Sequence, residues 1–416
     1  MEMRRGDVFV RVLVLAFVLG ACSEPFAATV PTWPNGGSLS GTRALTAPEK
    51  QSLEGVYVVT DGNGQFGDTL VLKWNGEYLS VYAGVHTAYM ILQAGATLDT
   101  ATGDSTILVQ GYWGYISTAA TGLAQAITPL HPPSGAAFAG VFGGGNAIPS
   151  SGMAFRFLRA LGPAAPTKPF YLISHHGSGG APELLPASEN TVEIAKIIER
   201  YGAMGIEVDT RPTADSIPVL FHDGAMSTRL TQKGSLEGPV ENYTFAQLQR
   251  YVRLLHGERI PSLAAFLDTV IVATNLQFVY VDMKSTSVGF LPQLVQVQQA
   301  AIAKAASLNR NVQIYLAITT DDELTEFLTL PGFQNIPTIC ELGIDQLQQA
   351  NSQVWSPASN QQIPQSDIDM LHGQGKLAIT WTVNVDDFLQ QFIEAGQLDG
   401  LLTDYLPLAS YYYYKQ

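Results

Sequence analysis

The regular alternation of strand-like and helix-like segments after residue 170 is the feature that most constrains the fold. We expect apolar strands at 170–174, 204–209, 217–221, 277–283, 312–317, 338–340, 377–383 and 398–403. Helical patterns lie between most of them, including 191–201, 244–254, 262–271, 291–308 and 385–395. Eight strands with intervening helices over about 245 residues predict an α/β fold, a (β/α)8 TIM barrel at residues 170–416.

Residues 51–160 follow a different pattern. Seven β-prone runs at 55–60, 69–74, 78–83, 87–92, 106–112, 136–142 and 153–158 are separated by Gly, Asn and Asp. This spacing predicts an N-terminal all-β domain, either an antiparallel barrel or a sandwich. Its many aromatic residues would fill a core or line a ligand pocket. A Pro/Ala-rich linker at 161–169 separates it from the alternating region.

The first residues predict export. The basic residues Arg4, Arg5 and Arg11 lie near the start of the chain, and an apolar run at 12–19 follows them. This run is too short to cross a bilayer, and together with the small residues after it, it predicts a secretory signal peptide at residues 1–21.

Leu19-Gly20-Ala21-Cys22 resembles the bacterial lipobox, in which the Cys is acylated and becomes the first mature residue. The alternative is an ordinary signal peptide cleaved after Ala27 or Ala28. We expect lipidation at Cys22, a flexible tether at 22–50, and a place in the cell envelope. Ser23 favours the outer membrane if the host is Gram-negative.

Composition excludes one class of partner. The formal net charge is −14 at pH 7, whereas a sequence-independent nucleic-acid binder needs a basic surface. With Cys22 lipidated, the other cysteine, Cys340, has no intrachain partner, and its apolar neighbours predict a buried thiol.

Polar residues follow most of the expected strands. They are His175 and His176 after the first, Glu207 and Asp209 after the second, His222 and Asp223 after the third, Asp282 and Lys284 after the fourth, Asn384 after the seventh and Asp404 after the eighth. Each one alone is explained by a helix cap, a core histidine or a solvated loop. Their shared position at the catalytic face of a TIM barrel predicts a metal-assisted active site.

Glu207 and Asp209 lie two residues apart in an apolar strand, so both point to the same face. Two carboxylates there indicate either a wet edge strand or a shared cation, because burying both is costly. The strand-end pattern favours the cation. With Asp282 as a third carboxylate and no Cys ligand, we expect Mg²⁺ or Ca²⁺ rather than zinc.

His175 and His222 would then face each other across this cation. Two imidazoles beside an oxygen-ligated metal suit attack on a phosphodiester, in which one accepts a proton and the other protonates the leaving oxygen. The metal and Lys284 would offset charge on the phosphoryl oxygens.

From about Leu172 to Pro407 the chain resembles the glycerophosphodiester phosphodiesterases. The shared motifs are SHHG at 174–177, ENT at 189–191, GIEVDT at 205–210, HDG at 222–224, IPSL at 260–263, VDMK at 281–284, WTVN at 381–384 and DGLLTDYLP at 399–407. Sphingomyelinase-type phospholipase D toxins and phosphatidylinositol-specific phospholipases C also use two histidines near strand ends. The ENT and WTVN motifs favour the first family.

The resemblance implies specific roles. His175 and His222 would be the acid/base pair, and Glu207, Asp209 and Asp282 the metal ligands. The residues implied to bind phosphate or substrate are His176, Lys284, Glu189, Asn190 and Trp381. Substrates would be glycerophosphodiesters such as glycerophosphocholine, which are hydrolysed to an alcohol and glycerol 3-phosphate.

Two residues depart from the family pattern. His176 stands where the family usually has Arg, so the bidentate grip of a guanidinium on phosphate is absent. Asp282 stands where Glu is common, and its side chain is one methylene shorter. Both changes suggest an altered choice of substrate or metal.

The expected function is therefore metal-dependent hydrolysis of glycerophosphodiesters by an enzyme anchored in a membrane through its lipid. One alternative is a phospholipase D/C-like phosphodiesterase that acts on lysophospholipids or polymers. Another is a surface binding protein whose β-domain binds sugar or lipid beside an inactive barrel. The complete set of His, acid and Lys residues favours hydrolysis.

Overall fold

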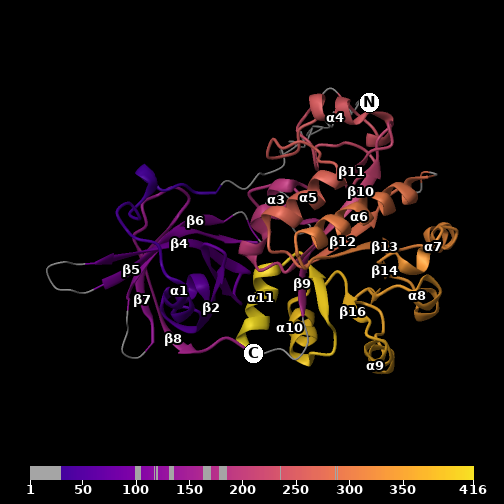
Figure 1. Ribbon diagram of the computed structural model, residues 1–416. Helices are drawn as coiled ribbons and strands as arrows, with labels where there is room; N and C mark the ends of the chain where they lie inside the picture. Colours follow the sequence, from indigo (N-terminus) through magenta and orange to yellow (C-terminus); the bar gives the residue numbers. More distant parts are fainter. Residues whose placement is uncertain are drawn as a thin grey trace, which may run out of the picture.

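The computed structural model describes residues 30–98, 105–116, 118, 120–130, 135–162, 170–177, 185–234, 236–285, 287 and 289–416. The expected signal peptide, Cys22 and most of the expected linker lie outside these residues. Two barrels lie side by side, with the C-terminal helix α11 (Leu406–Lys415) between them (Figure 1). No helix in the described ranges is long and apolar enough to cross a membrane.

The N-terminal region is a closed antiparallel barrel whose strands follow sequence order, with β8 pairing back onto β1. Its strands are β1 (Gly55–Asp61), β2 (Thr69–Asn75), β3 (Tyr78–Ala83), β4 (Ala88–Leu98), β5 (Ser105–Tyr115), β6 (Thr121–Pro129), β7 (Ala137–Gly144) and β8 (Ser151–Arg159). The all-β expectation is confirmed, and the sheet is a barrel rather than a sandwich. Strand β6 was not expected, because Gly and Ala are poor strand formers; its pairing with β5 and β7 holds it in place.

Side chains fill the interior of this barrel. The ring of Tyr57 lies 5.8 Å from the rings of both Phe138 and Phe155, in edge-to-face contact. Trp113 packs edge-on against Phe66 at 6.2 Å. The aromatic residues of this region therefore contribute to its core, which favours the core interpretation over a ligand pocket.

The segment before β1 packs onto the barrel. Trp33 donates its indole N–H to the Gly111 carbonyl at 2.9 Å, and Arg43 forms a backbone bridge with Ala96. Thr46 caps a short helix, α1 (Ala47–Ser52), and two further short helices are η1 (Pro34–Gly36) and α2 (Asn63–Phe66). The expected flexible tether at 22–50 is therefore wrong for residues 30–50.

The C-terminal region is a closed barrel of eight parallel strands, as predicted. They are β9 (Tyr171–Ser174), β10 (Gly205–Pro212), β12 (Phe278–Met283), β13 (Gln313–Ile318), β14 (Thr338–Cys340), β15 (Val354–Trp355), β16 (Leu377–Thr380) and β17 (Gly400–Thr403). The last strand, β17, pairs with β9 and closes the ring. Besides α11, its helices are α3 (Val192–Ile197), η4 (Ile198–Tyr201), α5 (Leu263–Ala273), α6 (Phe290–Ser307), α7 (Asp321–Leu328), α8 (Ile344–Ala350), α9 (Gln365–Gly373) and α10 (Asp386–Ala395), with short 3₁₀ turns η2 (His175–Gly177) and η6 (Phe333–Asn335).

One strand assignment is wrong. The apolar run at 217–221 is not the third barrel strand: β11 (Pro218–Leu220) pairs antiparallel with the far end of β10, outside the ring. Asp282 therefore ends the third strand of the barrel rather than the fourth. The strand that was missed is β15, whose two residues are too few to show a hydrophobic pattern.

Strand β11 belongs to an insertion between β10 and α5 that also contains η5 (Val240–Asn242) and α4 (Phe245–Tyr251). The insertion has its own buried apolar cluster, which includes Phe221, Leu230 and Leu248. It stands above the barrel in Figure 1. The apolar residues of the 217–221 run are explained by this cluster and not by the barrel.

Gly205 starts β10 and allows its neighbours to pack closely. A Cβ atom at this position would lie 2.8 Å from the Cβ of Phe278 and 3.2 Å from the Cγ1 of Ile173. Those residues are in β12 and β9, the two barrel strands that flank β10. Gly205 therefore fixes the spacing of the three strands that carry the polar residues described next.

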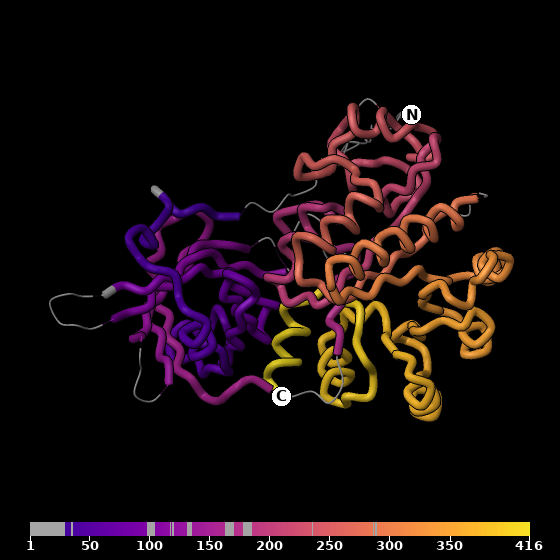
Figure 2. The backbone as a smooth tube through the Cα atoms, viewed as in Figure 1, coloured from indigo at the N-terminus to yellow at the C-terminus, as the bar shows by residue number. Residues whose placement is uncertain are grey.

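One buried apolar cluster spans the junction of the two barrels. Tyr89 and Ile91 of the first barrel belong to the same buried cluster as Tyr201 and Ala409 of the second. Figure 2 shows the yellow C-terminal helix between the indigo-to-magenta barrel and the rest of the chain. At this junction the Tyr411 hydroxyl lies 2.6 Å from the Oγ1 of Thr69.

Candidate active site

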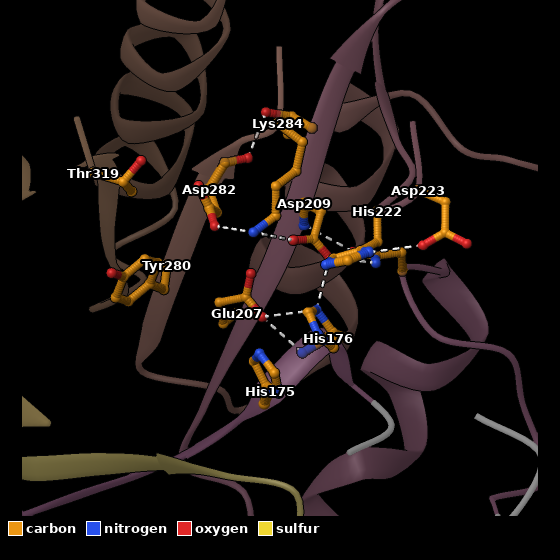
Figure 3. Close-up of polar contacts among 12 residues, drawn as sticks. His175, His176, Glu207, Asp209, His222, Asp223, Tyr280, Asp282, Lys284 and Thr319 are labelled. Carbon is orange, nitrogen blue, oxygen red and sulfur yellow. Dashed lines mark hydrogen bonds and ion pairs between the residues drawn. The ribbon is translucent and has the colours of Figure 1, made fainter. Parts of the chain in front are cut away.

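The polar side chains meet at the C-terminal ends of the first three barrel strands (Figure 3). Glu207 and Asp209 point from β10 to one face, and Asp282 of β12 is the direct register partner of Asp209. His175 begins the short turn η2 that follows β9. The barrel geometry thus brings together residues that are far apart in the sequence.

His222 also lies at this site, although it follows β11 and not a strand of the barrel. The backbone N–H of Phe221 donates to the Asp209 carbonyl at 3.0 Å, which continues the antiparallel pairing of β11 with β10. This pairing brings His222 beside Asp209 although β11 is outside the barrel.

The three predicted metal ligands form one cluster. Glu207, Asp209 and Asp282 each offer an oxygen, and these oxygens lie within 4.8 Å of one another. Burial raises the pKa of Glu207 well above its usual range, and the charges of Asp209 and Asp282 raise it further. Such a concentration of buried negative charge is unfavourable unless cations neutralise it.

Lys284 supplies part of that positive charge. Its Nζ pairs with Asp282 Oδ2 and lies 3.3 Å from Asp209 Oδ1. Burial alone would lower the pKa of Lys284, but Asp282 and Asp209 hold it above its usual range. The lysine is thus a permanent cation at the edge of the carboxylate cluster.

Asp209 is the most tightly held carboxylate. Its Oδ2 accepts from Asn190 Nδ2 at 2.8 Å and lies 2.7 Å from His176 Nδ1. Asn190 Oδ1 in turn accepts from the Asp209 backbone N–H. Burial alone would raise the pKa of Asp209, but His176 and Lys284 hold it well below its usual range, so the carboxylate is ionised.

Each member of the predicted acid/base pair is oriented by a carboxylate. His175 Nδ1 lies 2.7 Å from Asp404 Oδ1, and Asn384 donates to the other oxygen of Asp404 at 2.6 Å. His222 Nδ1 lies 2.9 Å from Asp223 Oδ1. Because a carboxylate accepts, both rings donate through Nδ1 and keep the Nε2 lone pair for other partners.

His176 lies between the other two imidazoles. Its ring centroid is 3.6 Å from that of His175 and 4.8 Å from that of His222. The ring directs Nδ1 at Asp209, and the backbone N–H donates to Glu207 Oε2 at 2.7 Å. The expectation was that His175 and His222 face each other across the cation, and the structure places the ring of His176 between them.

Glu189 occupies a second, deeply buried position near His222. Its Oε1 lies 3.4 Å from Arg229, and its Oε2 is buried without a hydrogen bond. Burial raises the pKa of Glu189 to about 8, although the Arg229 charge opposes this shift. Arg229 also binds both oxygens of Asp223 and so lies directly beside His222.

A cavity of about 180 Å³ opens beside the carboxylates. Trp381 lines it, with its indole N–H donating to the Ser356 carbonyl at 2.8 Å. Tyr280 and Glu341 also line the cavity and are hydrogen-bonded to each other. Burial, together with the charge of Asp282, raises the pKa of Glu341 to about 8.

Sequence reasoning missed several of these residues. Glu341 directly follows β14, so the strand-end rule would have identified it. Tyr280 lies two residues before Asp282 and so on the same face of β12, which is a detectable signal. Arg229 is in the insertion, and its place beside His222 has no signal in the sequence.

The donor set fits a hard divalent cation. Three carboxylates converge, and Asp209 Oδ1 is buried without a hydrogen bond, although Lys284 lies 3.3 Å away. Oxygen-only ligands of this kind are those of Mg²⁺ and Ca²⁺. Together with two oriented imidazoles, the arrangement is suited to acid/base chemistry on an anionic substrate.

Comparisons with known proteins agree with this chemistry. The sequence profile of the Glycerophosphoryl diester phosphodiesterase family matches residues 175–408, which is more than half of the chain. No curated protein matches the chain.

Several solved structures are similar to part of this chain. A glycerophosphodiester phosphodiesterase from Parabacteroides distasonis is 18% identical, with a TM-score of 0.46, over 58% of this chain and 95% of that one. A phosphodiesterase from Oleispira antarctica, in complex with the product sn-glycerol-3-phosphate, is 18% identical with a TM-score of 0.43, over 58% and 96%. A putative glycerophosphodiester phosphodiesterase from Galdieria sulphuraria is 16% identical with a TM-score of 0.45, over 59% and 98%.

The family match covers the strand ends that carry the imidazoles and carboxylates described above, and it favours hydrolysis over the inactive-barrel alternative. The chain belongs to the glycerophosphoryl diester phosphodiesterase family and is a phosphodiesterase.

Proposed function

We propose that the protein hydrolyses glycerophosphodiesters to an alcohol and glycerol 3-phosphate with the help of a divalent cation. The observation that supports this most strongly is the pair of carboxylate-oriented imidazoles, His175 and His222, on either side of His176 at the edge of the carboxylate cluster. Because Asp282 is shorter than the Glu common at this position, the metal screen described below must decide between Mg²⁺ and Ca²⁺.

The two imidazoles move the protons of the reaction. One, neutral, accepts a proton at Nε2 from the attacking water, and the other, which begins the step protonated at both nitrogens, donates its Nε2 proton to the oxygen that leaves phosphorus. Asp404 and Asp223 hold the Nδ1–H of each ring, which fixes the tautomer and stabilises each ring while it is protonated.

Other residues hold the substrate. Lys284 supplies a fixed positive charge beside the cavity, which favours the phosphoryl oxygens. Glu207, Asp209 and Asp282 would hold the cation, which when bound stabilises negative charge on those oxygens. Trp381 offers an apolar wall for the alcohol or glycerol portion.

The test is a metal screen. Purified protein is incubated with glycerophosphocholine, glycerophosphoethanolamine and glycerophosphoglycerol in Mg²⁺, Ca²⁺ or EDTA, and glycerol 3-phosphate is measured. We expect release with one or both cations, none with EDTA, and a loss of about 10²-fold or more in His175→Ala or His222→Ala. Full activity in EDTA, or no hydrolysis of any of these diesters, would contradict the proposal.

We also propose that the enzyme is exported and attached to the cell envelope through Cys22, on the basis of Leu19-Gly20-Ala21-Cys22. Incorporation of a labelled fatty acid in the native host, and its loss in Cys22→Ala, tests this. A wild-type protein that takes up no label while reaching the envelope would contradict lipidation.

A further inference from the structure

A second group of ligand atoms lies beside the three carboxylates. His176, Asp209 and His222 each offer one ligand atom, and these atoms lie within 4.8 Å of one another. Asp209 belongs to both groups, so the two are adjacent and share a carboxylate. Ligand atoms bound to one ion at about 2.1 Å are about 3–4 Å apart, so small side-chain movements complete either group.

We propose that His176, Asp209 and His222 form a second cation site, specific for the zinc class of metals. Two imidazole nitrogens and a carboxylate oxygen are typical ligands of Zn²⁺ and related transition metals. The oxygen-only group with Glu207 and Asp282 favours Mg²⁺ or Ca²⁺ instead. The two groups therefore bind different kinds of ion, with Asp209 as the bridging ligand.

Both imidazoles are arranged as metal ligands are. His222 donates its Nδ1–H to Asp223, which leaves the Nε2 lone pair free to coordinate an ion. A carboxylate behind a coordinating imidazole is a recurrent arrangement in metal sites, because it fixes the ring and makes the other nitrogen more basic. His176 Nδ1 and Asp209 Oδ2 share a hydrogen bond of 2.7 Å, and a bound ion takes the place of its proton, which moves to Nε2 of His176.

The backbone holds His176 in this place under strain. Its φ is 54°, in the left-handed region that residues other than Gly and Asn rarely adopt. Its N–H donates to Glu207, and its carbonyl accepts from the Asn190 N–H at 2.9 Å. These two hydrogen bonds fix the residue, and so the ring between Asp209 and His222.

The identity of residue 176 decides whether a second cation can bind. An Arg here would bring a permanent positive charge and no lone pair, and would repel a second ion. A neutral imidazole has a lone pair and no charge. The cationic side chains beside the group are Arg229 and Lys284, and Arg229 is paired with Asp223 while Lys284 is paired with Asp282.

Binding at this site has a consequence for catalysis. A second cation takes the Nε2 lone pair of His222, which the proposed reaction needs for proton transfer. Zn²⁺ would therefore inhibit hydrolysis while the first cation remains bound. This consequence rests on the proposed function, whereas the binding of the ion does not.

The binding experiment uses the full-length protein saturated with Ca²⁺ and titrated with Zn²⁺ by calorimetry. We expect the wild type to bind one equivalent of Zn²⁺, and His176→Asn to weaken this binding by at least about 100-fold, since loss of a ligand exceeds the 10–100-fold effect of an outer partner. Asn tolerates the left-handed backbone at this position. His86→Asn is the matched control, because His86 also has a positive φ, of 57°, but lies in the other barrel.

Three results would overturn the second site: no Zn²⁺ binding to the Ca²⁺-loaded wild type, equal affinity in His176→Asn and the wild type, or an equal loss in His86→Asn. If His176→Asn does not fold, nitrogen NMR of the wild-type imidazoles decides. Zn²⁺ must then shift the ring signals of both His176 and His222, and unmoved signals reject the site.

Hydrolysis is measured separately. The wild type in Ca²⁺ should lose activity on adding Zn²⁺, and His86→Asn should lose it equally. Full activity with the second site occupied would reject the inhibition. A protein that binds Zn²⁺ as described and hydrolyses no phosphodiester would reject the proposed function and support the second site.

Discussion

At the scale of single residues, the site depends on carboxylates that hold imidazoles. The three pairs are His175–Asp404, His176–Asp209 and His222–Asp223. Each pair fixes one tautomer and one ring orientation, so the reactive nitrogens are positioned before substrate binds. Asp404 is itself held by Asn384, which contacts both its backbone N–H and its side chain.

Asp404→Asn tests the importance of this orientation. The new amide must present its NH₂ either to the His175 Nδ1–H or to the Asn384 NH₂, so the ring loses its fixed tautomer. We expect kcat to fall by about 10–100-fold with little change in KM, because acid/base transfer and not binding is affected. Steady-state kinetics measure it, with Asp386→Asn as a control. A change confined to KM would contradict this role.

Glu189 gives a prediction about pH. Its folded-state pKa of about 8 exceeds the usual 4.5, so between these values the folded protein retains a proton that the unfolded chain has lost. Stability contributed by this group is therefore lost as pH rises from about 4.5 to 8. Glu189→Gln is always neutral and should match the wild type at pH 4 but exceed it by about 2–4 kcal/mol at pH 9.

Denaturant unfolding of the wild type and Glu189→Gln at pH 4, 6 and 9 measures this difference. The variant loses its contact with Arg229, but that pair is weak because the two atoms are 3.4 Å apart and the Arg229 side chain is 45% exposed. A variant less stable than the wild type at pH 9 would show that Glu189 is ionised and stabilised in the folded protein.

At the scale of elements, the insertion between β10 and α5 positions His222 beside Asp209. Strand β11 pairs with the end of β10, and its apolar side chains are buried in the insertion rather than in the barrel. An apolar run of five residues looks the same in either place, which is why the sequence predicted a barrel strand there. His222 was nevertheless placed correctly near Asp209, because a hairpin partner of β10 ends beside the same residues as a barrel strand would.

Phe221→Ala tests whether the apolar cluster of the insertion holds His222 in position. Phe221 is fully buried in the apolar cluster of the insertion, and truncation of such a ring costs about 3–5 kcal/mol. We expect local opening of the insertion and a fall in kcat, because His222 is the next residue. Hydrogen exchange should show faster exchange of the Phe221 amide, which is bonded to the Asp209 carbonyl. Tyr251→Ala, on the exposed side of α4, should change neither, and protection equal to the wild type in Phe221→Ala would contradict the argument.

At the scale of the whole molecule, the two barrels are joined by a buried aromatic contact. The ring of Tyr201 lies 5.0 Å from that of Tyr89, and its hydroxyl is 2.9 Å from the Tyr112 hydroxyl. The parallel barrel and the all-β class of the first domain were predictable, because strand and helix periods are local, whereas the choice between an antiparallel barrel and a sandwich stayed open. The contact between Tyr201 and the first barrel could not be predicted. The sequence indicates that Tyr89 and Tyr112 are core residues of their own domain, and Tyr201 lies far from them in the sequence.

The buried cluster that spans both barrels predicts that they unfold together. Tyr201 is completely buried, and Tyr201→Ala should cost about 3–5 kcal/mol and removes its contacts with Tyr89 and Tyr112 across the junction. Calorimetry of the wild type should show a single transition, whereas Tyr201→Ala should show two, because domains without a strong interface unfold separately. Tyr251→Ala, far from the interface, should retain one transition. Two transitions in the wild type would mean that the barrels are energetically independent despite this contact.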